Sequence, residues 1–358
     1  MRFALSEDQK MLADSVANAL ADLSPLERVR RFADAGEDTA PDLWAGLAEL
    51  GVPGILIPEE HGGLGLGLLE AALAAEALGA AVAPTPFLGS AVLAPLALTL
   101  AGSDAQKAKW LPKLAAGEIS AGAAIAEAVA GGRDGAGVEA RAGKLSGKAL
   151  FVLDGMTADL LVVADAKGGL HLVETPPAAQ RMDSIDATRR LAEVAFKDTL
   201  AQPLASNQAL ERLRDAAWVI LAAETLGAAQ TMLDKAVAYA KERRQFGRVI
   251  GSFQAVKHLC AEMAAEIEPA RALVWYAAYA FDHAPEEATV MAAHAKAHLS
   301  EIGRFVARTA TEVHGGIGMT DLLGLHYWFK RIGQNRQLLG GPEKVREYAA
   351  RAQGLVSA

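Results

Sequence analysis

Apolar side chains recur at helical spacing through the first third of the chain. They stand three or four positions apart in the first segment, which the capping-box pair Ser6 and Gln9 opens. A loop rich in Gly and Pro interrupts the pattern at 57–67, and another helical segment follows at 68–78. These signals predict an N-terminal helical domain over residues 1–120.

The pattern changes in the middle of the chain, where apolar runs become short and turn residues separate them. Such runs are typical of strands, and the turn residues at 165–169 are placed to close a hairpin. We therefore predict a small β domain over residues 121–203. Its expected strands lie at 149–153, 160–164, 170–173 and 191–196.

Long helical segments return after the β domain. Residues 216–243 are apolar over most of the helix circumference, which is expected of a central helix in a bundle. Pro269 predicts a kink in the next helix, and the Gly315-Gly316 pair is a plausible helix stop. The expected helices lie at 216–243, 254–281, 285–313 and 342–353. The fold class is therefore mainly α with a small β domain, and residues 204–358 form a C-terminal four-helix bundle.

Composition and charge narrow the function classes. Hydrophobic residues make up 52% of the 358 residues, which is ample for a core, and the net charge of −8 argues against a nucleic-acid-binding face. The apolar run at 216–226 is too short for a membrane span, which needs roughly 20 residues. A single cysteine, Cys260, and the lack of a signal-peptide pattern favour a cytoplasmic protein. His294 and His298 share a helix face, but no third ligand is evident, so no metal site is expected.

Two motifs stand in the C-terminal domain. The first reads Glu242-Arg243-Arg244-Gln245-Phe246-Gly247-Arg248 and is followed by a segment containing Gln254. The second reads His314-Gly315-Gly316-Ile317-Gly318-Met319-Thr320. Taken alone, such arginines could offset a helix dipole and such glycines could end a helix. In this order and spacing, and with matching segments at 5–10, 50–65 and 106–112, they resemble the acyl-CoA dehydrogenase family over nearly the whole chain.

The resemblance implies FAD as cofactor, an acyl-CoA thioester as substrate and electron-transfer flavoprotein as electron acceptor. In the family, the arginine matching Arg243 contacts the FAD pyrophosphate across a subunit interface, a role that suits the planar fork of a guanidinium. Phe246 would then face the adenine end, and the glycines would allow the backbone to approach the cofactor closely. The expected cofactor-binding residues are Arg243, Gln245, Phe246, Gln254, Gly315, Gly316 and Gly318.

The chain differs from the family at the positions expected to hold the catalytic base. In the family a glutamate removes the α-proton of the acyl-CoA while a hydride moves from the β-carbon to the flavin. Counting from Gly315 places Leu339 at the usual position of this glutamate, and Ala217 at the alternative position on the central helix. Neither side chain accepts a proton. Asp215 and Glu224 lie near Ala217 in sequence and are alternative bases, so the catalytic residue stays unknown.

The β domain also lacks family features. The family's Thr-Glu-Pro and Trp-Ile-Thr segments correspond to 126–128 and 151–153, where Phe151 could border the flavin ring but Leu153 supplies no hydroxyl. Gly132-Arg133-Asp134 replaces a Gly-Ser-Asp loop. Glu312 stands where a glutamine is common before the glycine loop, and a carboxylate near a pyrophosphate is unfavourable unless it is paired.

These losses affect the flavin ring and the base, while the motifs for the ADP part of FAD survive. The resemblance therefore favours the partner subunit of an unequal pair of acyl-CoA dehydrogenase chains, as in some bacterial relatives of steroid side-chain degradation. Three alternatives stay open: a complete homo-oligomeric enzyme with a relocated base, another flavin reaction such as oxygen-dependent oxidation, and a scaffold without flavin.

Overall fold

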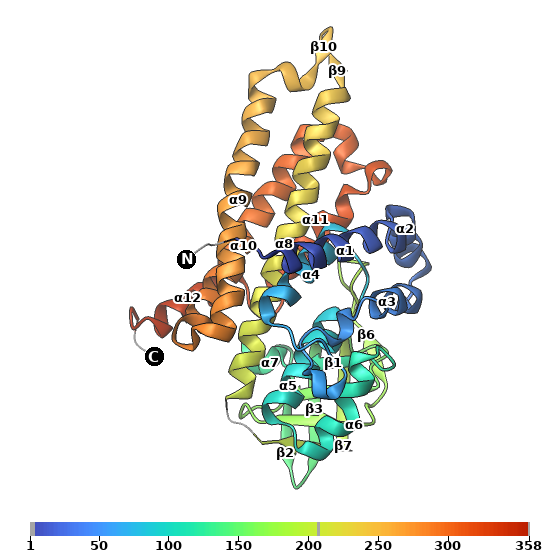
Figure 1. Ribbon diagram of the computed structural model, residues 1–358, viewed down its shortest axis with the longest axis vertical. Coiled ribbons are helices and arrows are strands. Elements are labelled where there is room, and N and C mark those ends of the chain that lie inside the picture. The colour runs from blue at the N-terminus through green and yellow to red at the C-terminus, as the bar shows by residue number, and fades with distance from the viewer. Residues whose placement is uncertain (1–3, 206–207, 357–358) are drawn as a thin grey trace.

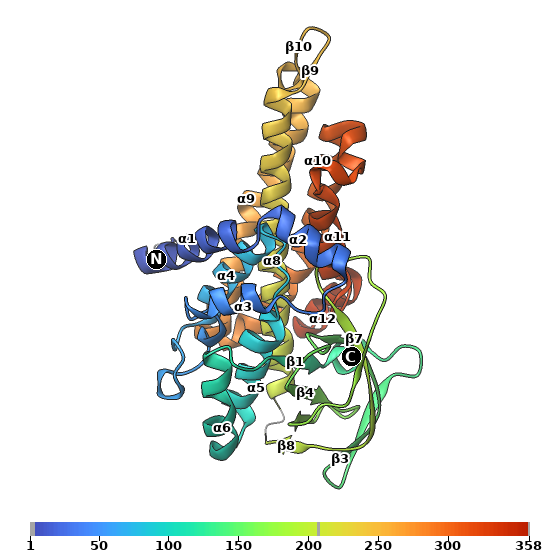
Figure 2. The same cartoon turned by 90° about the vertical axis from the view of Figure 1, so that its right-hand side faces the viewer.

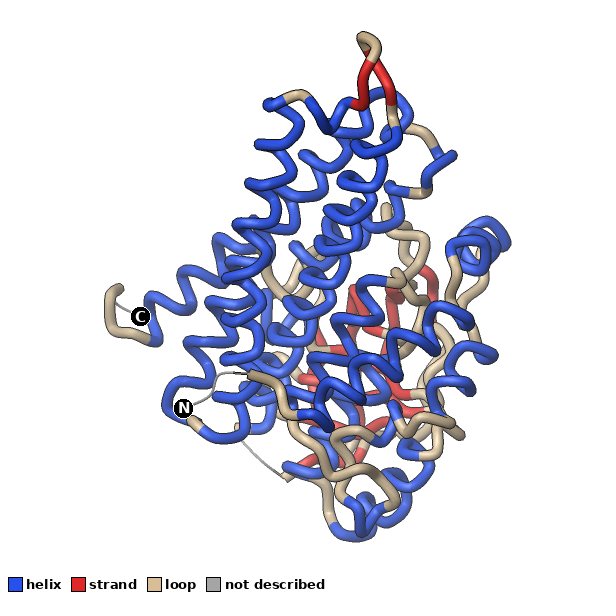
Figure 3. Tube along the Cα trace, turned by 45° about the horizontal axis from the view of Figure 1, so that its top comes forward, coloured by secondary structure: helices blue, strands red, loops and turns tan. Residues whose placement is uncertain are grey.

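The computed structural model describes residues 4–205 and 208–356, so the outer ends of the first and third predicted domains lie outside the described residues (Figure 1). Helices come first, a sheet follows and long helices close the chain. In Figure 3 the strands of this sheet gather on one side of the molecule, with helices around and beyond them. The predicted fold class, mainly α with a small β domain, is confirmed.

The N-terminal part is helical, as predicted. The Ser6 hydroxyl oxygen accepts a hydrogen bond from the Gln9 backbone N–H, and the Gln9 side-chain oxygen accepts one from the Ser6 backbone N–H, so the expected capping box opens the first helix. The helices are α1 (Glu7–Leu23), α2 (Leu26–Ala35), α3 (Pro41–Ala48), α4 (Leu68–Ala80), the π-helical η3 (Leu88–Leu93), α5 (Ala94–Ala101) and α6 (Asp104–Ala115), with 3-10 turns η1 (Val52–Gly54) and η2 (Glu59–His61).

The sheet follows the order β6-β7-β3-β1-β4-β5-β8, with β2 paired to β3. β1 and β4 are parallel, and the other neighbours are antiparallel. All four predicted strand positions are occupied, but β1, β2, β6 and β8 were not expected. The bounds are β1 (Ala121–Ala124), β2 (Gly137–Arg141), β3 (Lys144–Leu153), β4 (Leu160–Ala164), β5 (Leu170–Val173), β6 (Ala179–Arg181), β7 (Leu191–Leu200) and β8 (Gln202–Leu204), with the short helix α7 (Ala126–Ala130) after β1.

Long helices form the C-terminal bundle, and Pro269 lies inside α9 without ending it. An unexpected two-stranded hairpin, β9 and β10, joins α8 to α9 and lies at the end of the bundle farthest from the sheet (Figures 1 and 2). The bounds are α8 (Ala209–Glu242), β9 (Arg244–Gln245), β10 (Arg248–Val249), η4 (Ile250–Ser252), α9 (Gln254–His283), α10 (Pro285–His314), η5 (Gly315–Met319), η6 (Asp321–Leu323), α11 (Leu325–Gln337) and α12 (Pro342–Ala352).

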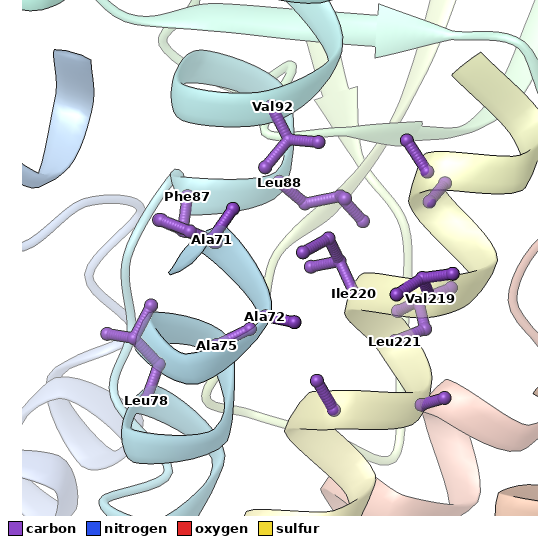
Figure 4. Packing of buried hydrophobic residues seen from close by; sticks show 14 of the residues in the cluster. Ala71, Ala72, Ala75, Leu78, Phe87, Leu88, Val92, Val219, Ile220 and Leu221 are labelled. Carbon is purple, nitrogen blue, oxygen red and sulfur yellow. The ribbon is translucent and has the colours of Figure 1, made fainter. Parts of the chain in front are cut away.

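Close packing of α4 against α8 joins the first and last parts of the chain. A Cβ atom at Gly227 would lie 1.8 Å from the Glu76 carbonyl oxygen, and one at Gly79 would lie 2.0 Å from that of Glu224, so only glycine permits this approach. Figure 4 shows the neighbouring part of the core, where Leu88 and Ile220 extend into the space between the π-helical turn and α8. The core thus runs continuously across the predicted domain boundary.

The central helix α8 is long and apolar enough to cross a membrane by length and composition. However, 89% of its most apolar window is buried inside the protein. A helix that is apolar all round and covered by other helices is a core helix, which is what the sequence predicted for this segment.

Candidate functional site

A cavity of about 250 Å³ lies between the sheet and the end of α11. Phe151 enters it from β3, at a bulge where the register with β7 shifts and the φ of Phe151 is +54°. The Phe151 N–H points to the Met182 sulfur at 3.1 Å, which connects this bulge to the segment between β6 and β7. The lining consists of Ala126, Glu127, Ala130, Gly131, Arg133, Phe151, Met182, Asp183, Ser184, Ile185, Leu191, Gly333, Gln334, Gln337, Leu338 and Leu339.

Leu339, at the position that motif spacing predicts for the base, lines this cavity. Its φ is +57°, and Gly340 follows with a φ of +111°. The Leu339 carbonyl oxygen accepts a hydrogen bond of 2.9 Å from the indole N–H of Trp218 on α8. Ala217, the alternative position, is fully buried on α8 and is not part of the lining. The loop therefore presents an apolar side chain to the cavity.

Glu224 belongs to a buried network of charges and does not line the cavity. Both of its oxygens lie 2.6 Å from the Arg189 guanidinium, and one lies 2.6 Å from that of Arg331. Burial by itself would raise the pKa of Glu224, but the two guanidinium groups outweigh burial and lower this pKa to about 2. A carboxylate held in this way is a poor proton acceptor, so the geometry does not support Glu224 as the base.

The low pKa of Glu224 leads to an expected acid dependence of stability. Because the folded-state pKa is about 2 and the ordinary value is 4.5, the contribution of Glu224 is present above pH 4.5 and is lost as the pH falls toward 2. Between pH 4.5 and pH 3 we expect a loss of roughly 1.5 kcal/mol from this group, since each pKa unit corresponds to about 1.4 kcal/mol and the last part of the loss comes below pH 3. Urea unfolding at pH 4.5 and pH 3 measures the loss in the wild type and in Glu224→Gln. An equal loss in both proteins would contradict this assignment.

Asp215 is also held in structural contacts. It accepts hydrogen bonds from Arg214 at 2.8 and 2.9 Å and from the Thr289 hydroxyl at 2.6 Å. Burial raises its pKa. Arg214 in turn donates to the Tyr348 hydroxyl, so the cluster ties α8 to α10 and α12. Asp215 is not part of the cavity lining, and the geometry does not support it as the base.

Glu127 is the acid that the sequence analysis did not single out as a candidate base. It lines the cavity, and its Oε1 atom accepts the Leu150 N–H at 2.7 Å, directly before the Phe151 bulge. Burial raises its pKa. Asp183 is the other carboxylate in the lining, and it is exposed. No spacing rule marks Glu127, because its place in the cavity depends on how α7 folds back against β3.

The first motif lies in the hairpin at the far end of the bundle (Figures 1 and 2). Its arginines, Arg243, Arg244 and Arg248, are exposed, and none of them forms a salt bridge with another described residue. Phe246 is 92% exposed at the turn, with a φ of +53°. Gln245 is also exposed in the hairpin, and Gln254 is exposed at the start of α9. This end of the chain is cationic and aromatic and is open to a ligand.

The second motif forms the 3-10 turn η5 after α10. Gly315 and Gly316 are exposed, and Gly315 has a φ of +64°. Gly318 is buried, and a Cβ atom there would lie 2.7 Å from the Thr311 carbonyl oxygen. His314, just before the turn, stacks on Tyr239 of α8 with ring centroids 4.7 Å apart. This stacking brings the turn to the same end of the bundle as the hairpin, so the structure brings the two motifs together there.

The cavity and the cationic end are far apart within one chain. Trp218, whose indole contacts Leu339, precedes Arg243 by 25 positions along α8. At 1.5 Å per residue this separates them by roughly 40 Å. The ribityl chain that joins the ring of FAD to its pyrophosphate is much shorter. One FAD molecule therefore cannot reach both regions of the same chain.

Comparisons with known proteins agree with this architecture. Residues 6–118 match the N-terminal domain of acyl-CoA dehydrogenase, and residues 207–353 match its C-terminal domain. The chain is 35% identical to acyl-CoA dehydrogenase IpdE2 of Mycolicibacterium smegmatis over 97% of its own length and 99% of that protein. The chain belongs to the acyl-CoA dehydrogenase family, which is a family of oxidoreductases whose cofactor is FAD.

Two solved assemblies contain similar chains. The ChsE4–ChsE5 complex from Mycobacterium tuberculosis matches with a TM-score of 0.91 and 26% identity, over all of both chains. The Tcur3481–Tcur3483 steroid acyl-CoA dehydrogenase, in a G363A variant, matches with a TM-score of 0.89 and 29% identity, over 98% of this chain and 99% of that one. Each of these names joins two different subunits.

Proposed function

We propose that this chain is the base-lacking member of an unequal pair of acyl-CoA dehydrogenase subunits. Its hairpin and η5 bind the ADP part of an FAD whose ring lies in a homologous partner chain, and the pair desaturates an acyl-CoA thioester at the α,β bond. The observation that carries the proposal is the apolar side chain of Leu339, which lines the chain's own cavity at the position predicted for the base. The separation of roughly 40 Å along α8 between the cavity and Arg243 supports a cofactor shared between two chains, whether these are equal or unequal.

The residues at the far end fit a dinucleotide. The Arg243 guanidinium is exposed and has no ion pair among the residues that the structure describes, and such a group can bind phosphate oxygens through two parallel hydrogen bonds. Phe246 offers an exposed aromatic face for the adenine, and Gly315 and Gly316 leave room for backbone contact, since nothing lies within 4 Å of a Cβ at either position. Gln245 and Gln254 supply amide groups for the remaining polar atoms.

The chain's own cavity fits the reaction poorly. FAD, when bound, would supply the acceptor for a hydride from the β-carbon, but loss of the α-proton needs a proton acceptor, and the Leu339 side chain is none. Leu153 is buried in the core and supplies no hydroxyl to the cavity. In the pair, this chain therefore positions the cofactor, while the partner supplies the base. The paired names of the similar assemblies support a hetero-oligomer, and IpdE2 and the steroid enzyme support a fatty acyl or steroid side-chain thioester.

We also propose electron-transfer flavoprotein as the electron acceptor of the pair and the cytoplasm as its location. Both follow from the family resemblance and the composition. A second candidate function is a complete homo-oligomeric dehydrogenase whose base has moved. One observation favours it: Glu127 is a carboxylate that lines the cavity and whose pKa is raised by burial.

Flavin content tests the two candidates. The chain is purified alone and together with a homologous chain that carries glutamate at the position of Leu339, and bound FAD per chain is measured from the flavin absorbance. We expect little flavin on the chain alone, about one FAD per pair in the mixture, and turnover of an acyl-CoA only in the mixture. One FAD per chain with turnover by this chain alone would contradict the unequal pair. Loss of that turnover in Glu127→Gln, with flavin retained, would favour the second candidate.

A further inference from the structure

Lys296 is a buried lysine that forms no ion pair with a carboxylate of the described residues. It lies on α10 with 2% of its surface exposed. Its Nζ atom donates to the backbone oxygens of Asn335 and Arg336, the second at 3.2 Å. These two carbonyl groups belong to the last turn of α11, whose carbonyls lack partners within the helix. An ammonium group suits the negative end of the helix dipole, but its burial away from a carboxylate is costly.

The residues at the end of α11 form one wall of the cavity. Gln337, Leu338 and Leu339 follow the carbonyl groups that Lys296 holds, and all three line the cavity. The loop then turns through two consecutive residues with positive φ, Leu339 and Gly340, a conformation that costs free energy for leucine. Lys296 at the helix end and the Trp218 indole at the Leu339 carbonyl contact the backbone of this wall directly. Side-chain hydrogen bonds of Asn335 and Arg336 and the burial of Leu338 and Leu339 hold it as well.

We propose that Lys296 is a positioning residue whose proton sets how firmly the end of α11, and with it the cavity wall formed by 337–339, stays closed. The wall would open more readily as the pH falls and close more firmly as the pH rises. This property concerns the cavity of the chain itself and holds whichever ligand the cavity receives.

The surrounding charges leave the ammonium without direct neutralisation. Arg336 on α11 disfavours the ammonium, and this arginine is itself paired with Glu301 of α10 and Glu343 of α12. On α12, Arg346 pairs with Glu301. On α8, the Glu224 carboxylate is paired with Arg189 and Arg331 and not with Lys296. The buried residues of α9 are all apolar.

The sign of the pH effect follows from burial. Burial, with a smaller contribution from Arg336, lowers the pKa of Lys296 from 10.5 to about 7. When the end of α11 opens, the amine reaches water and its pKa returns toward 10.5. Opening therefore takes up a proton between pH 7 and pH 10.5, and a rise in pH opposes it, by up to about tenfold in the opening equilibrium per pH unit. Below pH 7 both states are protonated, and the dependence disappears.

Hydrogen exchange followed by mass spectrometry tests this proposal on the purified full-length chain, or on the pair if the pair is the form obtained. After correction for the intrinsic pH dependence of exchange, we expect the protection of amides in 334–341 to rise several-fold to tenfold per unit between pH 7 and pH 9. Protection between pH 6 and pH 7 should stay flat. A wild-type protein whose 334–341 protection does not change with pH, while exchange remains measurable, would overturn the proposal without any variant.

Two substitutions sharpen the test. Lys296→Met keeps the length of the side chain and removes the titrating group, so the pH dependence of 334–341 should vanish in it. Lys235→Met is the matched control, because Lys235 is a half-buried lysine that lies against Trp328 near the other end of α11, with its Nζ 4.8 Å from the ring centroid. This control should keep the wild-type dependence. An unchanged dependence in Lys296→Met, or a lost one in Lys235→Met, counts against Lys296.

Discussion

Replacing Arg331 by methionine is expected to lower the free energy of unfolding by roughly 3–5 kcal/mol. Arg331 is 1% exposed and donates to Asp186 at 2.7 Å, to Glu224 at 2.6 Å and to the Thr188 hydroxyl at 2.7 Å. Methionine fills a similar volume but leaves Asp186, which is also buried, without a cation. The cost arises mainly from that uncompensated charge. Urea unfolding at pH 7.5 measures it.

A matched substitution distinguishes the loss of the buried charge network from the general effect of removing one arginine on the free energy of unfolding. Arg351→Met removes a guanidinium from an exposed pair with Glu347 on α12, which is worth well under about 1 kcal/mol. If Arg331→Met costs no more than Arg351→Met, the network does not stabilise the fold as argued. The double variant Arg331→Met with Asp186→Asn should recover part of the loss, because it removes the unpaired carboxylate as well.

The charge network around Arg331 explains why the sequence alone could not exclude Glu224 as the catalytic base. Its partners, Arg189 and Arg331, lie 35 residues before it and 107 residues after it, and no local pattern links them. A glutamate within an apolar helix indicates that the carboxylate has a binding partner or a functional role, but the sequence does not show which residues that partner includes. The separation between Arg243 and the cavity was similarly hidden, because it depends on α8 continuing without a break.

Elements with a strong local signal were predictable from the sequence, and others were not. The return of helix near residue 208 was predicted, but the apolar pattern that defined the central helix began only at 216, because charged residues at 211–215 interrupt the apolar run, and α8 begins at Ala209. β1 consists of Ala-Gly-Ala-Ala, which carries no strand preference, and it is a strand because β3 and β4 flank it. Motif spacing led from Gly315 to Leu339, which the structure places in the cavity lining, while its assignment to the position of the base stays a prediction. Its positive φ and its place in the cavity required the structure.

Replacing Arg243 by alanine in this chain is expected to weaken FAD binding by the assembled pair roughly 10- to 100-fold. A charge-assisted hydrogen bond to phosphate is worth about 1.5–3 kcal/mol, and alanine removes the guanidinium without disturbing a packed contact, because Arg243 is exposed at the end of α8. Apo pair is titrated with FAD, and binding is followed by the quenching of flavin fluorescence. Phe246→Ala should weaken binding in the same assay, since it removes the aromatic face offered to the adenine.

Lys241→Ala provides the control for net charge. Lys241 is exposed in the last turn of α8, two positions before Arg243, so its loss changes the charge of the same end by the same amount. A general electrostatic effect would weaken FAD binding equally in both variants and would shrink in both as salt is added. A specific contact with the pyrophosphate predicts a much larger loss for Arg243→Ala. If that variant keeps wild-type affinity while the pair stays assembled, this end of the chain does not hold the cofactor, and the ADP part of FAD must be bound by the partner alone.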